Sequence, residues 1–248
     1  MLALILPVFR DKAGFFKKGF EISRSTMFGI RFLRLDIYHE KRVTKPALYR
    51  RVKKALKALR VQGASRAIVP DGFEYKPMVF SSGISIIDAR PIYLMMLPEL
   101  LRISADLLGI DTRRSLAVVH GGGVTDTQRT VTGLKDTVRF ISVTGKYGEE
   151  IFRSFLEKTG ISVMKGDVPA ELYENRIDIY LDDGDGKILE IDGRSLSAGD
   201  IEFERPEGSP GFIPDGAIAQ LYKVLTDNGL ILPEHISVRK VLFGKTTA

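Results

Sequence analysis

Residues 115–166 decide the fold class of this chain, and they read SLAVVHGGGVTDTQRTVTGLKDTVRFISVTGKYGEEIFRSFLEKTGISVMKG. Apolar runs at Leu116–Val119, Val138–Val143 and Ile161–Met164 have the length and β-branched content of buried strands. The first run ends in a glycine loop, Gly121–Gly123, and long segments separate the runs. Strands joined by long crossovers pair in parallel. The stretch therefore predicts an α/β fold with a parallel sheet.

The chain beyond this stretch predicts an antiparallel edge on the same sheet. Two further apolar runs, Ile177–Leu181 and Lys187–Ile191, are separated only by the turn Asp182–Gly186. A connection this short joins antiparallel neighbours. An amphipathic helix at Ala217–Leu225 follows a loop rich in proline and glycine.

The beginning of the chain predicts a smaller α/β or α+β part of its own. Leu2–Phe9 is apolar enough for a buried strand, and Ile30–Tyr38 alternates as a half-buried strand does. Thr44–Gly63 has the periodicity of a helix, with Pro46 in its first turn, where a missing N–H costs nothing. We expect a basic N-terminal part at residues 1–85 and a second domain, with the larger sheet and the C-terminal hairpin and helix, at residues 86–248.

Composition excludes several classes of protein and site. The chain of 248 residues contains no cysteine, which rules out disulfides, thiolate metal sites and cysteine nucleophiles. The apolar start is too short and too uncharged for a signal peptide, and charged residues interrupt the longer apolar region Ile84–Leu108. We therefore expect a cytoplasmic protein that is not inserted in a membrane.

The net charge of +6 is distributed unevenly along the chain. Residues 1–60 contain 16 Lys or Arg and 4 Asp or Glu, whereas the other 188 residues contain 21 and 27. Such an asymmetry indicates two different functional surfaces, or two parts that attract each other.

Much of the positive charge falls on one face of the helix predicted at Thr44–Gly63. Arg50, Lys53, Lys54 and Lys57 lie opposite the apolar stripe of that helix. Such a face can bind the phosphates of a nucleic acid, can be merely solvated, or can dock on acidic residues of the same chain or of a second copy. The sequence leaves these alternatives open.

The glycine loop is the best candidate for a binding site. Glycines let the backbone approach a ligand closely, and the start of a helix offers free N–H groups to an anion. Thr125 or Asp126 can cap the helix that follows, and His120 leads directly into the loop. Lys146, just past the second strand, stands where a cation can accept a 2′-phosphate.

The segment 115–181 resembles a Rossmann-type dinucleotide domain in these features, without pointing to a particular family. The resemblance implies binding of NADP or NAD through His120, Gly121, Gly122, Gly123, Thr125 and Lys146, with NAD(P)-dependent oxidoreductase as the first enzyme class to consider. It departs from the G-x-G-x-x-G fingerprint because Asp126 replaces the third glycine. Thr125–Thr137 is also rich in threonine and contains Gly133, which predicts an irregular crossover rather than a good helix.

Two other motifs are weaker evidence for a functional site. His120–Gly123 resembles the oxyanion loop of lipases, but the chain contains no G-x-S-x-G elbow. Asp183 and Asp185 have the spacing of a metal–nucleotide site, yet a solvated turn between two strands explains them as well.

The sequence therefore predicts a Rossmann-like protein that binds a nucleotide, a dinucleotide or another phosphorylated small molecule at the glycine loop. The alternative is a scaffold without enzymatic activity, whose basic N-terminal helix contacts a partner protein, a second copy or nucleic acid. No pattern in the sequence identifies a catalytic acid, base or nucleophile.

Overall fold

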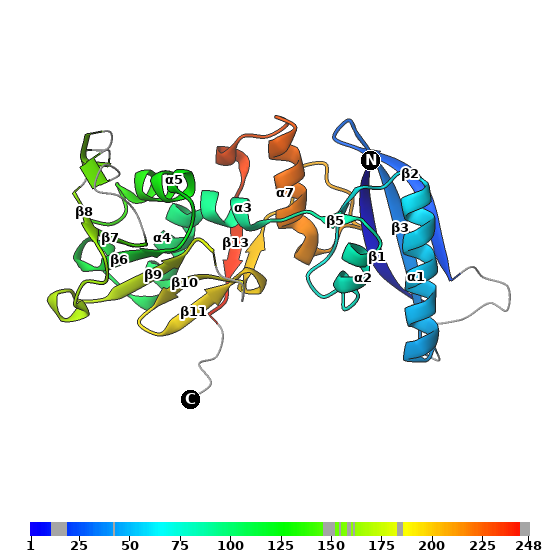
Figure 1. Ribbon diagram of the computed structural model, residues 1–248, viewed down its shortest axis with the longest axis horizontal. Coiled ribbons are helices and arrows are strands. Elements are labelled where there is room, and N and C mark those ends of the chain that lie inside the picture. The colour runs from blue at the N-terminus through cyan, green and yellow to red at the C-terminus, as the bar shows by residue number, and fades with distance from the viewer. Residues whose placement is uncertain are drawn as a thin grey trace. The chain divides into compact units, whose positions relative to one another are not determined.

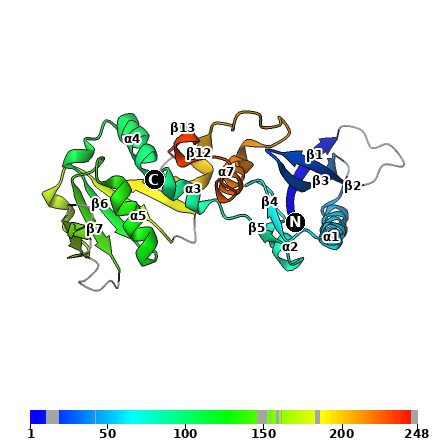
Figure 2. The same cartoon turned by 90° about the horizontal axis from the view of Figure 1, so that it is seen from above.

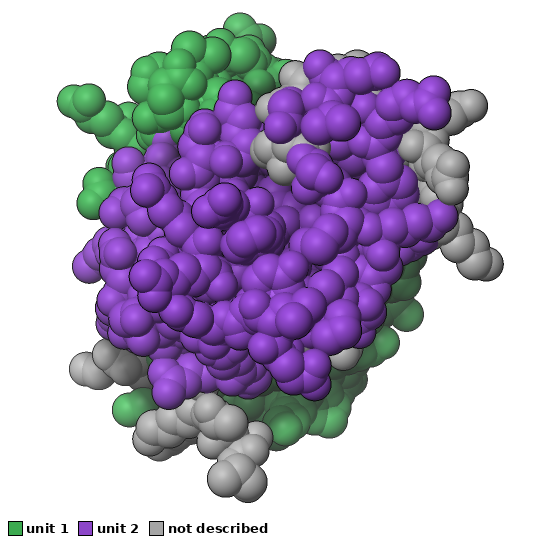
Figure 3. Space-filling model, turned by 90° about the vertical axis from the view of Figure 1, so that its left-hand side faces the viewer, with its two compact units in different colours: residues 1–89, 204–235 green, residues 90–203, 236–248 purple. Residues whose placement is uncertain are grey.

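The computed structural model describes residues 1–10, 19–41, 43–145, 152–153, 155–157, 160, 162–182 and 186–243. The chain forms two compact units, each built from two segments (Figure 3). Unit 1 consists of residues 1–89 and 204–235, and unit 2 consists of residues 90–203 and 236–248.

Unit 1 is built on a five-stranded sheet in the order β2-β3-β1-β4-β5 (Figure 1). β1 pairs in parallel with β3 on one side and with β4 on the other, and β5 extends the parallel part. β2 pairs antiparallel with β3 and forms the edge. The strands are β1 (Leu2–Arg10), β2 (Phe20–Met27), β3 (Ile30–Glu40), β4 (Arg66–Ile68) and β5 (Ser85–Ile86).

Helices α1 (Lys45–Val61) and α2 (Lys76–Ser81) cover one face of this sheet (Figures 1 and 2). Alternate residues of β3 point to α1, and they bury an apolar core with the stripe on the helix. Pro46 stands in the first turn of α1, as predicted, and Thr44 is the N-cap residue without a capping side-chain bond. The centre of this core comprises Ala3, Ile5, Leu33, Leu35, Ile37, Val52, Leu56 and Leu59.

The other segment of unit 1, residues 204–235, contacts the sheet on the opposite face. Phe212 lies under the guanidinium of Arg34, 4.2 Å from ring centroid to Cζ, and Arg34 points away from the α1 side. Helix α7 (Ile218–Asp227) supplies Gln220, whose buried amide bonds both the N–H and the C=O of Val69 at 2.7 Å. Two 3₁₀ turns flank this helix, η4 (Asp215–Ala217) and η5 (Pro233–His235).

Unit 2 is a Rossmann-like six-stranded sheet in the order β11-β10-β9-β6-β7-β8. β6, β7, β8 and β9 are parallel, whereas β10 and β11 form an antiparallel edge, as the sequence predicts. The strands are β6 (Leu116–His120), β7 (Phe140–Thr144), β8 (Val163–Lys165), β9 (Arg176–Tyr180), β10 (Lys187–Ile191) and β11 (Arg194–Ser197).

The crossover between β6 and β7 is a regular helix, α5 (Val124–Leu134), so the prediction of an irregular segment is wrong. Tertiary contacts override the poor propensity, because Thr127, Val131 and Leu134 are buried on one face of α5. Gly133 also has a packing reason, since a Cβ there would lie 3.4 Å from Pro98 Cγ of the neighbouring helix α4 (Leu97–Leu108).

The remaining elements of unit 2 are short. α3 (Arg90–Met95) precedes α4, and Pro98 lies in the first turn of α4, where a new helix begins. β12 (Ile201–Phe203) and β13 (Val238–Val241) pair antiparallel in a separate two-stranded sheet. The 3₁₀ turns are η1 (Thr112–Arg114), η2 (Ala170–Leu172) and η3 (Ala198–Asp200).

The structure confirms a mixed α/β fold with two mostly parallel sheets. It groups residues 204–235 with the N-terminal segment, whereas the sequence prediction assigns all of residues 86–248 to the second part. The bonds of Gln220 to Val69 give the physical reason for that grouping. Within the described residues, no helix combines the length and the apolar character needed to span a membrane.

Candidate functional site

The strand order of unit 2 places the glycine loop at the point where the chain stops adding strands on one side of β6 and continues on the other side. From β6 the chain passes through α5 to β7 and then β8 on one side, and it returns to β9 on the other side of β6. Ligands of open α/β sheets bind at the carboxyl ends of the strands next to such a switch point. The loop after β6 therefore occupies the position where ligands of such sheets bind.

Two of the loop glycines are required by geometry. Gly121 and Gly122 have positive φ angles of 70° and 85°. A Cβ on Gly122 would lie 2.6 Å from Leu181 Cδ1, so no side chain fits there. The N–H of Gly122 donates to the carboxylate of Asp182 at 2.7 Å. The loop thus binds an oxyanion that belongs to the protein itself.

The start of α5 differs in detail from the sequence prediction. Gly123 is the N-cap residue, and no side chain caps the helix, so neither Thr125 nor Asp126 has the capping role predicted for it. Both lie in the exposed first turn instead. First-turn N–H groups without a capping side chain attract an anion, helped by the helix dipole. Lys146 lies outside the described residues.

His120 is the centre of a polar cluster on one face of the sheet. It aligns with Thr144 on β7 and with Tyr180 on β9, and side chains at such paired positions share a face. The rings of His120 and Tyr180 stack, with centroids 5.1 Å apart. His120 Nε2 lies 2.6 Å from Asp178 Oδ1, and Nδ1 lies 2.9 Å from the hydroxyl of Thr144.

Asp178 is held as a carboxylate by its neighbours. Burial opposes its ionisation, but hydrogen bonds from His120 and Arg176, with the charges of both, outweigh burial and lower the pKa of the carboxyl. Arg176 donates from both Nε and Nη2, at 2.8–3.0 Å. These bonds to Asp178, followed by the charges of Asp178 and Asp167, outweigh desolvation and raise the pKa of the Arg176 guanidinium.

This arrangement favours one protonation pattern for His120. An ionised carboxylate only accepts hydrogen bonds, so Nε2 of His120 donates to Asp178. The other nitrogen, Nδ1, is then the one that forms a hydrogen bond with the hydroxyl of Thr144. A histidine oriented by a buried carboxylate is the usual form of a general acid–base group. The cluster is equally a satisfied polar network that fixes the carboxyl ends of three strands.

Arg90, the first residue of α3, fixes the corner that carries Asp182. Its Nε donates to the carbonyl of Leu181 and its Nη2 to that of Tyr180, both at 2.6 Å. Nη2 also reaches the carbonyl of Lys187 at 3.2 Å. These three carbonyls flank the turn between β9 and β10, so Arg90 positions the carboxylate that faces Gly122.

The structure brings His120 and the glycines together with four residues that the sequence prediction missed. Thr144, Arg176, Asp178 and Asp182 complete the site, although Asp182 follows its partner Gly122 by 60 residues in the chain. One signal was available, because Asp178 is a charged residue in the middle of an apolar strand.

No metal site is evident in the parts of the chain that the structure describes. Within them, no group of three or more histidine or acidic side chains has a geometry that holds an ion. The motif predicted as a metal–nucleotide alternative, Asp183 and Asp185, lies outside the described residues.

The basic helix face predicted for the N-terminal part is exposed. Arg50, Lys53, Lys54 and Lys57 all lie on the solvent side of α1. Arg50 donates only to the carbonyl of Pro46, at 3.4 Å, and the three lysines form no ion pair with any described residue.

No family model matches the chain, and no curated protein matches it.

Proposed function

We propose that unit 2 binds a nucleotide or dinucleotide at the carboxyl edge of β6, β7 and β9. One observation carries this proposal: the Gly122 N–H already binds a carboxylate at the switch point of a Rossmann-like sheet. The loop therefore has the geometry that binds a phosphate oxygen, with Asp182 as the resident anion.

Asp182 leaves two ways for a nucleotide to bind. Because it is exposed, its bond to Gly122 contributes little and a phosphate can replace it, while the free amides of α5 bind the other oxygens. Alternatively, Asp182 stays in place and accepts hydrogen bonds from ribose hydroxyls. The two modes predict opposite effects when the charge of Asp182 is removed.

An oxidoreductase function depends on the identity of this ligand. NADP and NAD are the first candidates, with Lys146 as the residue that would favour NADP. In a cytoplasmic NAD(P)-dependent enzyme, the pair His120–Asp178 supplies an oriented proton donor and acceptor at the binding edge.

Thermal unfolding with added ligand tests the proposal directly. NAD, NADP, ATP and S-adenosylmethionine are added separately to the full chain, each at about 1 mM. A ligand present at about 100 times its Kd stabilises the folded state by about 2.7 kcal/mol, which raises the midpoint by several degrees. If none of the four raises it, the proposal is wrong.

The variant Asp182→Asn then separates the two binding modes. If a phosphate replaces the carboxylate, the substitution removes a competing anion and tightens binding about tenfold. If the carboxylate accepts from a ribose, the substitution weakens binding by a similar factor. Asp136→Asn, an equal charge change in the exposed segment after α5, is the matched control. Equal affinities in all three proteins would place the ligand elsewhere.

The exposed cations of α1 favour a second candidate function, the binding of nucleic acid by a scaffold protein. Replacing Lys53, Lys54 and Lys57 by glutamate should abolish salt-dependent retention on immobilised DNA. Three exposed lysines of unit 2 serve as a control of equal charge, namely Lys135, Lys165 and Lys240. Retention that falls equally in both triple variants would reflect net charge alone.

A further inference from the structure

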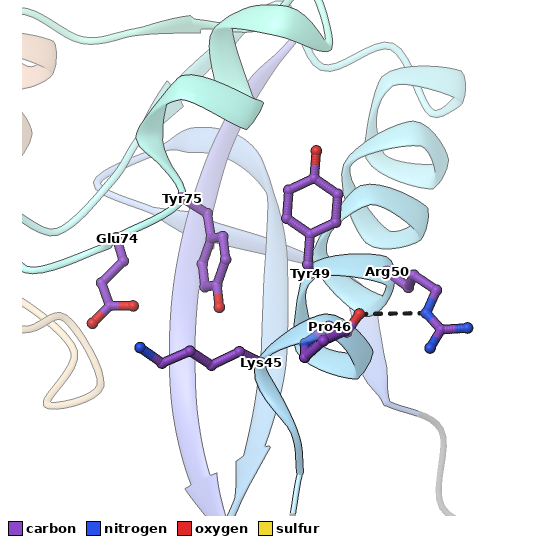
Figure 4. Close-up of a pocket in the computed structure, with 6 residues that line it drawn as sticks. All are labelled: Lys45, Pro46, Tyr49, Arg50, Glu74 and Tyr75. Carbon is purple, nitrogen blue, oxygen red and sulfur yellow. Dashed lines mark hydrogen bonds between the residues drawn. The ribbon is translucent and has the colours of Figure 1, made fainter.

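A pocket of about 690 Å³ opens in unit 1, at the carboxyl edge of its own parallel sheet. β3 leads through Glu40 into the start of α1, and β4 leads through the loop at residues 69–75 into α2. The pocket lies between these two helix starts and is wide open to solvent (Figure 4). Pockets of roughly 300–1,000 Å³ hold ligands of the size of a nucleotide. Its lining residues are Lys45, Pro46, Tyr49, Arg50, Glu74 and Tyr75.

Two tyrosines form the walls of the pocket. Tyr49 projects from α1 and is 50% exposed, and Tyr75, the N-cap residue of α2, lies on the other side of the pocket with its hydroxyl pointing the opposite way (Figure 4). The ring of Tyr75 is anchored, because it packs edge-on against Phe73 at 5.8 Å, and Phe73 belongs to the core of unit 1. An exposed ring and a partly buried ring on opposite walls are suited to a planar group, since stacking tolerates any aromatic base.

A cation lies at the base of the pocket. The side chain of Lys45 runs below Tyr75 toward the side of Glu74 (Figure 4), and within the described residues Lys45 forms no ion pair. The guanidinium of Arg50 is turned away, toward the carbonyl of Pro46. The first turn of α1 has neither an acidic residue nor a capping side-chain bond. Lys45 and this turn together favour an anionic group.

Two further polar groups lie at the same edge. Glu74 is exposed on the wall opposite α1 and can accept hydrogen bonds from hydroxyl or amino groups. His39, at the end of β3, is on the face that packs against α1, and its Nε2 is buried without a hydrogen-bond partner among the described residues. Burial and then the charge of Arg51 lower the pKa of His39, and the charge of Glu74 opposes this shift.

We propose that this pocket binds a mononucleotide, with the base between Tyr49 and Tyr75, the phosphate on Lys45 and the start of α1, and the ribose hydroxyls on Glu74. A nucleotide combines the planar ring, the anion and the hydrogen-bond donors that these walls complement. The site belongs to unit 1 alone and does not depend on the glycine loop of unit 2.

Calorimetric titration of the full chain with AMP, adenosine and inorganic phosphate tests this site. We expect AMP to bind more tightly than adenosine or phosphate alone. Lys45→Gln should weaken AMP at least tenfold and leave adenosine unchanged, whereas Tyr75→Leu should weaken both nucleotide and nucleoside about tenfold. Lys53→Gln removes the same charge further along the exposed side of α1 and should change nothing.

Three results would overturn the proposal: no AMP binding to the unmodified protein at millimolar concentration, equal loss in Lys45→Gln and Lys53→Gln, or no effect of Tyr75→Leu. Circular dichroism confirms that each variant is folded. Asp182→Asn should leave the affinity for AMP in this pocket unchanged, so failure here and failure of the nucleotide site in unit 2 are distinguishable.

Discussion

The two sheets of this protein end in carboxyl edges of opposite character. In unit 2, the edge is closed on itself, because Asp182 accepts from Gly122, and Asp178 accepts from His120 and Arg176. In unit 1, the edge has an open pocket with the exposed Tyr49, the partly buried Tyr75 and the exposed Lys45. Polar residues at a strand end are therefore not sufficient evidence for a ligand. What distinguishes the two edges is how much of their hydrogen-bonding capacity the protein itself uses.

The largest expected effect concerns the closed edge. Gly122→Ala places a Cβ 2.6 Å from Leu181 in a backbone with φ of 85°, so it should destabilise the protein by about 2–3 kcal/mol. Gly123→Ala is the control, because φ is −76° and no heavy atom lies within 4 Å of the added Cβ. Urea unfolding measures both. Equal losses would mean that the loop is not packed as tightly as described.

Replacing Arg176 at the edge of unit 2 should lower the free energy of unfolding slightly less than Gly122→Ala does. Arg176→Gln leaves the half-buried carboxylate of Asp178 with fewer donors, which costs about 2 kcal/mol at pH 7. Arg194→Gln, at an exposed position of β11, should cost less than about 0.5 kcal/mol.

The loss of stability in Arg176→Gln should depend on pH. Because the folded-state pKa of Asp178 is lowered, its contribution is present above the ordinary carboxyl pKa and is lost as pH falls through the folded-state pKa. The difference in unfolding free energy between the unmodified protein and Arg176→Gln should therefore shrink below about pH 4. A difference that does not change with pH would show that Asp178 is not the group concerned.

Asp182→Asn should have a small effect on stability in the absence of ligand. Its carboxylate is exposed, and one hydrogen bond to Gly122 contributes about 1 kcal/mol at most. A loss above 2 kcal/mol in urea unfolding would mean that Asp182 is a structural part of the loop, and would contradict its exchange for a phosphate.

The smallest expected effect belongs to the open edge and is a change in pH dependence. Burial and then Arg51 lower the pKa of His39, while Glu74 raises it. A group with a lowered pKa stabilises the fold above its unfolded pKa of about 6.5, and this contribution is lost as pH falls toward the folded value. His39→Gln should therefore lose less stability between pH 7.5 and 5.5 than the unmodified protein. Glu74→Gln should lose more, and a reversed order would refute the electrostatic influence of Glu74 on His39.

The sequence predicts the framework of this fold because the framework is built from buried strands. Leu116–Val119 is apolar over its full length, and Ile177, Ile179 and Leu181 are buried in the next strand of the sheet. The structure places both segments at the centre of the six-stranded sheet, paired in parallel with each other. β2 escaped prediction because it is an edge strand in which most positions are polar and partly exposed. α5 was missed because packing against Pro98 and the core, rather than local propensity, makes it a helix.

The candidate sites were predictable only in part. The glycine loop follows from local sequence, but its partner Asp182 looks like an ordinary turn residue before the fold is known. The contact between His120 and Asp178 depends on the register of β6 against β9, which brings together residues 58 positions apart. The pocket of unit 1 depends on two helix starts that no single motif connects.

The return of residues 204–235 to unit 1 has a consequence for synthesis on the ribosome. The chain passes between the two units three times, and unit 2 in turn needs β13 to complete the pair with β12. Neither unit can finish folding when its first segment emerges, because Gln220 reaches Val69 only after 151 further residues are made. We therefore expect a long half-life for folding during translation. We also expect that fragments cut near residue 89 fail to fold, because the chain path is interleaved.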